Sequence, residues 1–360
     1  MAQSKGTILL TGANGGFGCA IVSKILSTTT LSHHHGIYAV RDANKPTCTL
    51  DALISRQHLS YPHTSSHSCE KTSLDFSKLD SVRQAAASIN ERVSAGEVPR
   101  IRAIVLNAGY EEFKQQTWTE DGLDTTFTVN YLGQWLLVML LLQSMDLENG
   151  RVVWISSFSH NPNDYRSVFI GSHREDKYKI AITNDLEPVA KGTWSPNPLN
   201  ATVRTWAPGY RRYGVSKLCG VTMINELQRR LDQDPILKNI SVLAIDPGSM
   251  ATGIVRNGSW FLRVVIFQIL VRFLGIVMVR LFPNGTWRTL DKSASDVTAA
   301  AFEASPPPLS ERPKGIYLNG SELGQYNSEA DDPVKGKVVW SGSVKYSGLK
   351  QGETSLKEWK

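Results

Sequence analysis

The sequence is poor in cysteine and begins without an apolar leader. Its four cysteines, Cys19, Cys48, Cys69 and Cys219, are widely spaced and form no CxxC pair. No apolar run of the kind found in secretory signal peptides precedes residue 7. We therefore expect a protein of the reducing cytoplasm, where structural disulfides are rare.

No internal repeat is visible, and no basic cluster is interleaved with aromatic residues, so we expect no nucleic-acid partner. The net charge of +6 suits an anionic cofactor equally well. The content of 41% hydrophobic and 20% charged residues is typical of a globular chain with a sizeable core. A histidine run at 33–35, with further histidines at 58, 63 and 67, is interpreted as a solvated loop, and no metal site is predicted.

Short apolar runs of the β type alternate with longer stretches of helical spacing. The runs lie at 7–10, 36–41, 101–106, 151–155, 240–245 and 315–318, and the clearest helical patterns at 17–26, 79–93, 123–145 and 213–231. This alternation predicts an α/β fold of the Rossmann type, a doubly wound parallel sheet covered by helices on both faces. We expect it to occupy residues 1–320 as one domain.

Two segments fall outside the alternation and are expected to be insertions at the ligand-binding edge, at 159–212 and 253–290. The second contains an apolar stretch, 260–282, that is long enough to span a bilayer, but its three arginines oppose a span. A lid over an apolar pocket and a peripheral contact with a membrane surface are the alternatives. The Gly/Ser/Lys-rich tail, 321–360, is expected to lie loosely on the surface.

A glycine-rich loop joins the first predicted strand to the first predicted helix. Its residues are Thr11, Gly12, Ala13, Asn14, Gly15, Gly16, Phe17 and Gly18. Glycines there allow the pyrophosphate of a dinucleotide to approach the backbone and the free N–H groups of the helix. The spacing differs from GxGxxG, so the fingerprint of the commoner dinucleotide enzymes is not matched.

Arg41 ends the second predicted strand, where an acidic residue would bind the ribose of NAD and a basic one the 2′-phosphate of NADP. This favours NADP(H). Asp42 follows directly and could point toward the same ribose, so NAD(H) stays the less favoured alternative.

Tyr213 and Lys217 lie four residues apart, which places both on one face of a helix. A cation near a phenol stabilises the phenolate and would bring proton exchange at an alcohol oxygen within reach. Ser156 and Ser157 end a predicted strand at the ligand-binding edge, where one hydroxyl could hydrogen-bond a substrate carbonyl. Asn130 lies within a predicted helix.

Taken in order, these motifs resemble those of the short-chain dehydrogenase/reductase superfamily from residue 7 to about 319. The family's TGxxxGxG loop is matched by Thr11, Gly12, Gly16 and Gly18, its NAG motif by Asn107, Ala108 and Gly109, its catalytic Asn, Ser, Tyr and Lys by Asn130, Ser157, Tyr213 and Lys217, and its Pro-Gly motif by Pro247 and Gly248. Thr252 stands where a nicotinamide-contacting threonine is usual, and Asp75 where an acidic residue contacts adenine.

The resemblance implies that Ser157 polarises the substrate oxygen, Tyr213 transfers the proton, Lys217 tunes Tyr213 and holds the nicotinamide ribose, and Asn130 supports a proton relay. One departure is the long insertion of 55 residues, 158–212, between Ser157 and Tyr213, which leaves Ser156 and Ser159 open as alternatives to Ser157. With the apolar stretch 260–282, the insertion is similar to that of fungal secondary-metabolite and 3-ketosteroid reductases.

The expected function is interconversion of a ketone and a secondary alcohol on a bulky, apolar, terpenoid-, polyketide- or sterol-like substrate. A non-catalytic NADP-binding sensor or scaffold is the alternative. By the same resemblance, homo-oligomers would form through the helices that carry Asn130 and Tyr213.

Overall fold

A computed structural model describes residues 5–60, 68–112, 115–197, 206–250 and 271–360. In these described residues, eight strands form one sheet in the order β3-β2-β1-β4-β5-β6-β7-β8. Every neighbouring pair is parallel except the last, β7 with β8. The strands are β1 (Thr7–Thr11), β2 (His35–Val40), β3 (Cys69–Ser73), β4 (Ile101–Leu106), β5 (Arg151–Ile155), β6 (Ser241–Asp246), β7 (Tyr317–Asn319) and β8 (Glu322–Leu323). The predicted doubly wound sheet is confirmed, and the polar strand β3 is an addition to it.

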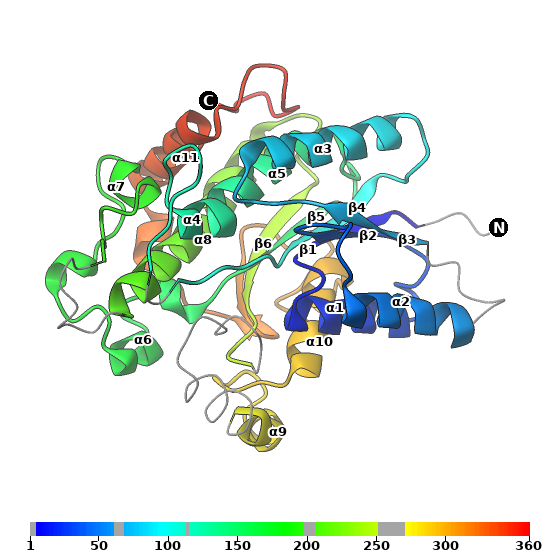
Figure 1. Cartoon of the computed structure of the whole chain (residues 1–360), viewed down its shortest axis with the longest axis horizontal. Coiled ribbons are helices and arrows are strands. Elements are labelled where there is room, and N and C mark those ends of the chain that lie inside the picture. Colours follow the sequence, from blue (N-terminus) through cyan, green and yellow to red (C-terminus); the bar gives the residue numbers. More distant parts are fainter. Residues whose placement is uncertain (1–4, 61–67, 113–114, 198–205, 251–270) are drawn as a thin grey trace.

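Helices cover both faces of the sheet (Figure 1). One layer contains α1 (Gly16–Ser27), α2 (Cys48–Ser60) and α10 (Leu290–Phe302), and the other contains α3 (Leu79–Ser94), α5 (Gly133–Leu141), α8 (Ala207–Gln233) and α11 (Pro333–Ser347). Shorter helices, α4 (Thr125–Phe127), α6 (Tyr165–Ile170), α7 (Glu187–Ala190) and α9 (Val271–Leu281), lie outside these layers or at their ends.

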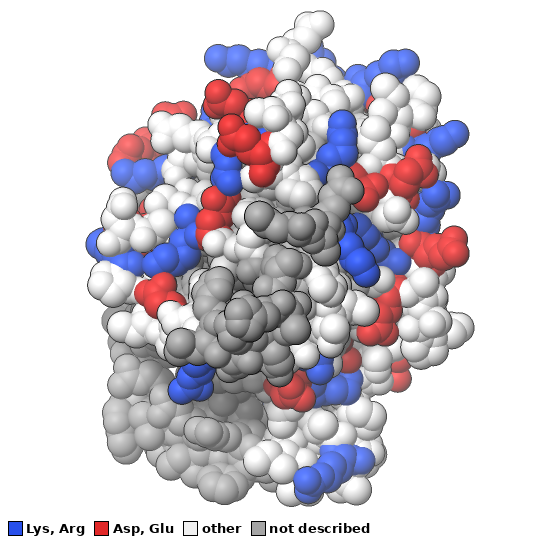
Figure 2. Space-filling model, turned by 90° about the vertical axis from the view of Figure 1, so that its right-hand side faces the viewer, with Lys and Arg blue, Asp and Glu red and all other residues white. Residues whose placement is uncertain are grey.

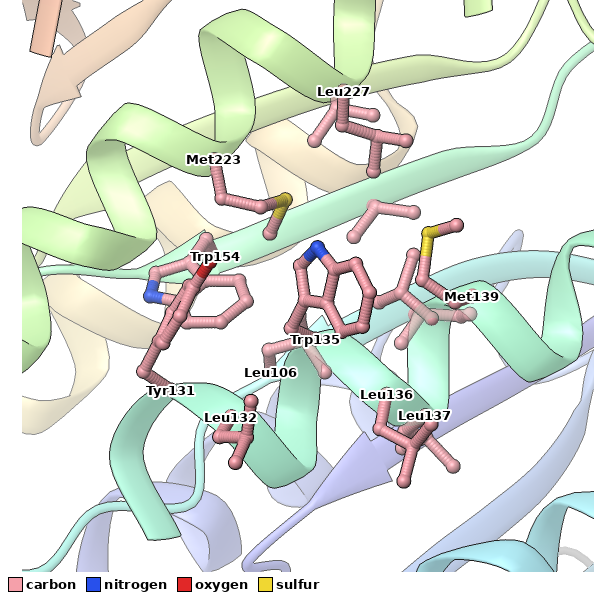
Figure 3. Close-up of a cluster of buried hydrophobic side chains, with 14 of the residues drawn as sticks. Leu106, Tyr131, Leu132, Trp135, Leu136, Leu137, Met139, Trp154, Met223 and Leu227 are labelled. Carbon is pink, nitrogen blue, oxygen red and sulfur yellow. The ribbon is translucent and has the colours of Figure 1, made fainter. Parts of the chain in front are cut away.

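Each strand divides its side chains between two cores, because successive residues of a strand point to opposite faces. In β1, Leu9 packs with the layer of α3, α5 and α8, whereas Ile8 and Leu10 pack with α1 and α10. Figure 3 shows the larger core, in which Trp135 of α5 lies among Met223 and Leu227 of α8 and Trp154 of β5. Burial of this apolar surface on both faces is what makes the sheet the rigid base of the site.

The predicted helix at 123–145 is interrupted. A π-helical turn, Thr128–Leu132, separates α4 from α5 and carries Asn130 at its centre. Such single-turn bulges are frequent at functional sites and redirect one side chain within an otherwise regular helix. Here the bulge directs the Asn130 amide at the loop after β4, where its oxygen accepts from the Tyr110 N–H at 2.7 Å.

The prediction of a loose C-terminal tail is wrong. Asp332 caps the first turn of α11, and Trp340 of that helix is buried to 2% exposure. Its ring meets Trp135 edge-on at 5.4 Å, and Tyr131 shares a 2.7 Å hydrogen bond with Ser343. The Gly/Ser/Lys composition concealed this packing, because the small residues are the ones that let α11 approach its neighbours closely.

A buried arginine near the end of the insertion at 159–212 attaches it to the body of the fold. Arg212, at 2% exposure, donates to the backbone oxygens of Ser195 and Gln115 and lies 3.2 Å from the Asp124 carboxylate. A buried arginine is tolerated only with such partners. Arg212 therefore fixes the insertion to the body of the fold beside α4.

Of the apolar stretch 260–282, residues 271–281 form α9, and residues 251–270 lie outside the described part of the chain. Figure 1 shows α9 at one extremity of the molecule. The loop that follows α9 reaches the cleft described below through Thr286 and Trp287. Within the described residues, one helical run, Thr125–Ser144, is long and apolar enough to cross a bilayer, but 94% of its tested window is buried in the core.

The histidine run is not the solvated loop that we expected, because His34 is buried and its ring lies 5.3 Å from that of Phe302. On the face shown in Figure 2, basic and acidic side chains are intermixed over the described surface.

Candidate functional site

A large cleft with a volume of about 1610 Å³ opens where the parallel strands end. The loops after β1, β2, β4, β5 and β6 all contribute to its walls. In open α/β sheets this carboxyl edge is where ligands bind. The cleft contains most of the predicted site residues, namely Gly12, Asn14, Gly16, Phe17, Gly18, Arg41, Asp75, Asn107, Ala108, Gly109, Ser157, Tyr213, Lys217, Pro247 and Gly248.

The three motif glycines of the first loop have different reasons to be glycine. Gly12 has a left-handed φ of +64°, and a Cβ on Gly18 would lie 2.8 Å from the Ala13 Cα. A Cβ on Gly16 would meet no atom within 4 Å, although this residue faces the cleft. Gly12 and Gly18 thus shape the loop, whereas Gly16 leaves open space at the start of α1, where unpaired helix N–H groups favour phosphate.

Thr11 is placed differently from the prediction. It is fully buried and does not line the cleft; instead its hydroxyl oxygen accepts from the backbone N–H groups of Asn107 and Ala108, each at 3.0 Å. The Asn107 amide in turn donates to the oxygens of Thr11 and Gly12. These residues hold the first loop against the loop after β4, so Thr11 shapes the cofactor site from behind.

The end of the cleft beside β2 carries Arg41, Asp42 and Lys45. The Asp42 carboxylate accepts from the Asn44 N–H at 3.0 Å and lies 3.5 Å from Lys45, so it is engaged by its own turn. Lys45 is a second cation that the sequence analysis missed; its spacing of four residues from Arg41 was the available signal. Asp75 lines the same end and accepts from the Ser77 N–H and hydroxyl.

The predicted proton-transfer residues meet at the centre of the cleft. Tyr213 and Lys217 project from successive turns of α8, and Ser157 follows β5. The side chains of Ser157 and Tyr213 both line the cleft and interact electrostatically with each other. Ser159 donates to the Ser157 hydroxyl at 3.1 Å, and of the three serines considered Ser157 is the one whose side chain influences the pKa of Tyr213.

Lys217 is almost fully buried, at 3% exposure. Its ammonium donates a 2.9 Å hydrogen bond to the Ile155 carbonyl and lies 5.7 Å from the centre of the Tyr213 ring. Burial disfavours the charged form and lowers the pKa of Lys217 to about 8. The Lys217 ammonium therefore lies near the phenol ring, and its pKa is close to neutral pH.

The expected lowering of the Tyr213 pKa is not found. Burial, followed by the neighbouring Glu111 carboxyl, raises the pKa of this phenol well above its usual range. The Ser157 side chain acts to lower this pKa, but its effect is smaller than that of burial. In this environment Tyr213 is a proton-carrying group, suited to donating its proton to an oxygen that becomes more basic during a reaction.

Glu111 is the main residue that sequence reasoning missed. It follows the Asn107-Ala108-Gly109 motif by two positions, lines the cleft and is only 6% exposed. Burial raises its pKa to about 8, and the Lys217 cation acts against that rise. The adjacent acidic residues Glu111 and Glu112, directly after this motif, were the feature of the sequence that could have indicated a buried carboxyl here.

Asn130 lies behind the wall of the cleft. Its amide donates to the Tyr110 carbonyl at 2.9 Å and to the Ser216 hydroxyl at 3.0 Å, and it is fully buried. It thereby ties the loop that carries Glu111 to α8, and its relay role stays a prediction.

Arg288, which is only 1% exposed, packs against the Pro247-Gly248 turn. The guanidinium donates to the Asp246 carbonyl at 2.9 Å, and Gly248 has a left-handed φ of +76° that places its backbone against this arginine. Thr252 lies outside the described residues.

The remaining wall is formed largely by aromatic rings from both insertions and from α8. These are Phe158, Tyr165, Phe169, Trp206, Tyr210 and Trp287. Arg166 joins this wall to the sheet, because its guanidinium bonds Asp164, lies 3.3 Å from the Asp246 carboxylate and stacks 4.2 Å from the Phe158 ring centre. The Tyr165 hydroxyl is 2.7 Å from that of Thr286, so the two insertions meet at the mouth.

Comparison with known proteins places this geometry in a family. A family model described as short chain dehydrogenase matches residues 6–169. The chain is 40% identical to the short-chain dehydrogenase iccH of Talaromyces variabilis, over 99% of this chain and all of that protein. Its fold is similar to an NADPH-bound carbonyl reductase from chicken fatty liver (TM-score 0.53, 16% identity, 89% of this chain and 98% of that one). It is also similar to the landomycin C-6 ketoreductase LanV with bound NADP and rabelomycin (TM-score 0.51, 16% identity, 89% and 96%). The chain belongs to the short-chain dehydrogenase/reductase family.

Proposed function

We propose that this protein is an NADP(H)-dependent reductase that converts a ketone of a bulky apolar molecule to a secondary alcohol, and the reverse. The observation that carries the proposal is that Ser157, Tyr213 and Lys217 line the same cleft as the glycine loop. A proton donor, a second hydroxyl and a dinucleotide-type cradle are the three parts that such a reaction needs.

The described residues fit a dinucleotide. The start of α1 with the open space beside Gly16 suits the pyrophosphate, and Arg41 with Lys45 suits a 2′-phosphate. Because Asp42 is already engaged by its own turn, the balance at the ribose favours NADP(H) over NAD(H). NADPH and NADP occupy the two proteins of similar fold named above, in agreement with this assignment. When bound, the reduced nicotinamide supplies the hydride.

The protein's own residues then handle the oxygen of the substrate. The Ser157 hydroxyl donates a hydrogen bond to the carbonyl oxygen, which withdraws electron density from the carbon that receives the hydride. The Tyr213 hydroxyl gives its proton to the resulting alkoxide. Lys217, held against the Ile155 carbonyl, places a positive charge beside the phenolate that forms.

The substrate class follows from the aromatic wall. Phe169 is 90% exposed and Tyr165 is 71% exposed at the mouth of the cleft, although both side chains are apolar or mainly so. When an apolar ligand covers rings that are exposed around a cleft, the burial of their apolar surface favours binding. We therefore expect a terpenoid-, polyketide- or sterol-like ketone of secondary metabolism as the substrate. If the rim of the cleft contacts a membrane surface, such an apolar molecule could enter the cleft directly from the membrane.

A non-catalytic NADP-binding sensor or scaffold is the second candidate, because the cradle alone would serve it. A sensor or scaffold, however, would not need the arrangement of Ser157, Tyr213 and Lys217. A sensor would keep its function when Tyr213 is replaced by Phe, whereas a reductase would lose it.

The test is fluorescence titration of the purified protein with NADPH and with NADH, for wild type, Arg41→Asp and Lys45→Ala. NADPH should bind more tightly, and both substitutions should weaken NADPH selectively. A ketone panel follows, with androstenedione, camphor and 2-tetralone against dihydroxyacetone. Absence of binding of either nucleotide would reject the reductase, and turnover of dihydroxyacetone alone would reject the apolar substrate.

A further inference from the structure

The Ser157 hydroxyl is held by a residue that follows it in the chain. Its oxygen accepts hydrogen bonds from the Ser159 N–H at 3.3 Å and from the Ser159 hydroxyl at 3.1 Å. Neither bond uses the Ser157 proton, which can therefore be donated to an oxygen in the cleft. The direction of that donation depends on where the short helical turn Phe158–His160 lies.

His160, the last residue of this turn, connects Ser157 to a distant part of the chain. Its ring Nδ1 lies 2.5 Å from the Ser157 carbonyl oxygen, and its backbone N–H donates to the same oxygen at 3.2 Å. On the other side of the ring, Nε2 accepts from the Asn327 N–H at 3.3 Å. The residue is only 3% exposed, and its ring centre lies 5.3 Å from that of Tyr317. Contacts on both nitrogens therefore fix the ring.

The two ring contacts require the same tautomer. A carbonyl oxygen can only accept, so Nδ1 carries the proton that is donated to Ser157, and Nε2 must be unprotonated to accept from Asn327. The other tautomer would place the Nδ1 lone pair against the Ser157 carbonyl oxygen and two N–H groups against each other. Burial lowers the pKa of His160, which favours the neutral ring that the Asn327 contact needs.

Asn327 belongs to a well-bonded junction. Its side-chain oxygen accepts from the Glu329 N–H at 3.0 Å and caps the short turn that follows. The Glu329 carboxylate accepts from the Ile182 N–H of the insertion at 3.0 Å and from the Lys335 ammonium of α11 at 2.7 Å. The insertion and the C-terminal segment thus jointly hold the backbone that binds the His160 ring.

We propose that His160 is a positioning residue for Ser157 whose tautomer is set by the Asn327 N–H, an inference that rests on the proposed reductase function. The Nδ1–H holds the Ser157 carbonyl and so fixes the turn from which Ser159 orients the Ser157 hydroxyl toward the substrate oxygen. His160 itself does not line the cleft, so it acts only through Ser157. Because a misplacement of about 1 Å can cost about 100-fold in rate, this support matters for the reaction.

The tautomer can be measured without cofactor or substrate. In protein labelled with 15N-histidine, the ring-nitrogen chemical shifts at pH 7 distinguish the two tautomers, and comparison with His160→Asn assigns the His160 signals. We expect a protonated Nδ1 and an unprotonated Nε2. A protonated Nε2 in the wild-type protein would overturn the inference, whatever the kinetic results.

The kinetic test uses 2-tetralone and NADPH at pH 7. His160→Ala should lower kcat by about 10- to 100-fold and leave the Kd for NADPH within about threefold. His160→Asn should recover most of the lost kcat, because its side-chain amide can still donate to the Ser157 carbonyl. His34→Ala is the matched control, since His34 is also buried and its Nδ1 also contacts the carbonyl of the residue three positions earlier, Leu31. Its kcat should stay within about twofold of wild type.

Wild-type kcat in His160→Ala would overturn the positioning role. A kcat in His160→Asn as low as that in His160→Ala would overturn it as well, since the donor to Ser157 would then not matter. Absence of NADPH binding and of turnover in wild type would instead overturn the proposed function.

Asn327 allows the second contact of the ring to be removed alone. Its φ of −64° suits proline, so Asn327→Pro removes the N–H without requiring a new φ. Asn327→Ala loses the same side chain but keeps the N–H, and is the reference. Asn327→Pro should have a kcat about 10-fold below that of Asn327→Ala, because the His160 ring can then adopt the other tautomer and release Ser157. Equal kcat values in the two variants would overturn the role assigned to Asn327.

Discussion

The Lys217 ammonium donates a 2.9 Å hydrogen bond to the carbonyl of Ile155, the last residue of β5. This bond ties the helix that carries the proton-transfer pair to the strand that precedes Ser157. The relative positions of Tyr213 and Ser157 are thus set by the sheet edge, and a buried cation is the cost of that arrangement.

That cost is measurable. Lys217→Met should abolish reduction, and at pH 7 it should raise the melting temperature, because it removes a buried charge. Folding lowers the pKa of Lys217 from 10.5 to about 8, so the unfolded chain binds more protons between these values. Wild type should therefore gain stability relative to Lys217→Met as the pH rises from 8 to 10.5. Melting curves over this window decide the matter, with the exposed Lys177→Met as the control; a pH-independent difference would contradict the lowered pKa.

Removal of the phenolic oxygen should separate binding from chemistry. Tyr213→Phe should decrease kcat by at least about 100-fold while leaving the Kd for NADPH within about threefold, because the ring and the cradle remain. NADPH oxidation with the ketone panel and fluorescence titration give the two numbers. Tyr326→Phe, which removes a hydroxyl on the partly exposed Tyr326–Asp331 pair, is the control. A Tyr213→Phe protein with full activity would show that another group supplies the proton.

The glycine loop offers a matched pair of substitutions. Gly18→Ala should destabilise the fold by about 1 to 3 kcal/mol, because the new Cβ would lie 2.8 Å from the Ala13 Cα. Gly16→Ala meets no atom within 4 Å and should leave the melting temperature unchanged or slightly higher. It should nevertheless weaken NADPH binding, since its methyl group enters the cleft. Equal NADPH affinity in wild type and Gly16→Ala would place the pyrophosphate elsewhere.

The C-terminal helix should matter for stability. Trp340→Ala should reduce the free energy of unfolding by about 3 to 5 kcal/mol, because the ring is buried against Trp135 and lies 4.2 Å from the Arg230 guanidinium. Denaturant unfolding measures this loss. Val334→Ala, at a position of the same helix that is 69% exposed, should change it by less than about 0.5 kcal/mol. Similar values for the two variants would indicate that α11 contributes little to the core.

Several features could be predicted from local patterns. The apolar runs that form β1, β4, β5 and β6 are buried on both faces. Their hydrophobic residues are therefore nearly continuous, and the start and end of each strand can be predicted from the sequence. Strand β3 was missed because its residues Cys69–Ser73 are mostly polar and half-buried, and only pairing with β2 makes them a strand. The packing of the segment 321–360 was not predicted for a related reason. Its small residues allow close contact with other helices, and that contact exists only in the folded structure.

By itself the sequence determined the α/β class, the glycine loop and the spacing of Tyr213 and Lys217, because these depend on neighbours within one element or one turn. Only the tertiary structure decided that Ser157, Tyr213 and Lys217 line one cleft, that Glu111 lines it with them, and that the buried Thr11 hydroxyl binds the loop after β4. Burial and electrostatic contact between distant segments produce these relationships. For the same reason the tertiary structure reversed the expected direction of the Tyr213 pKa, since desolvation by the fold raises it.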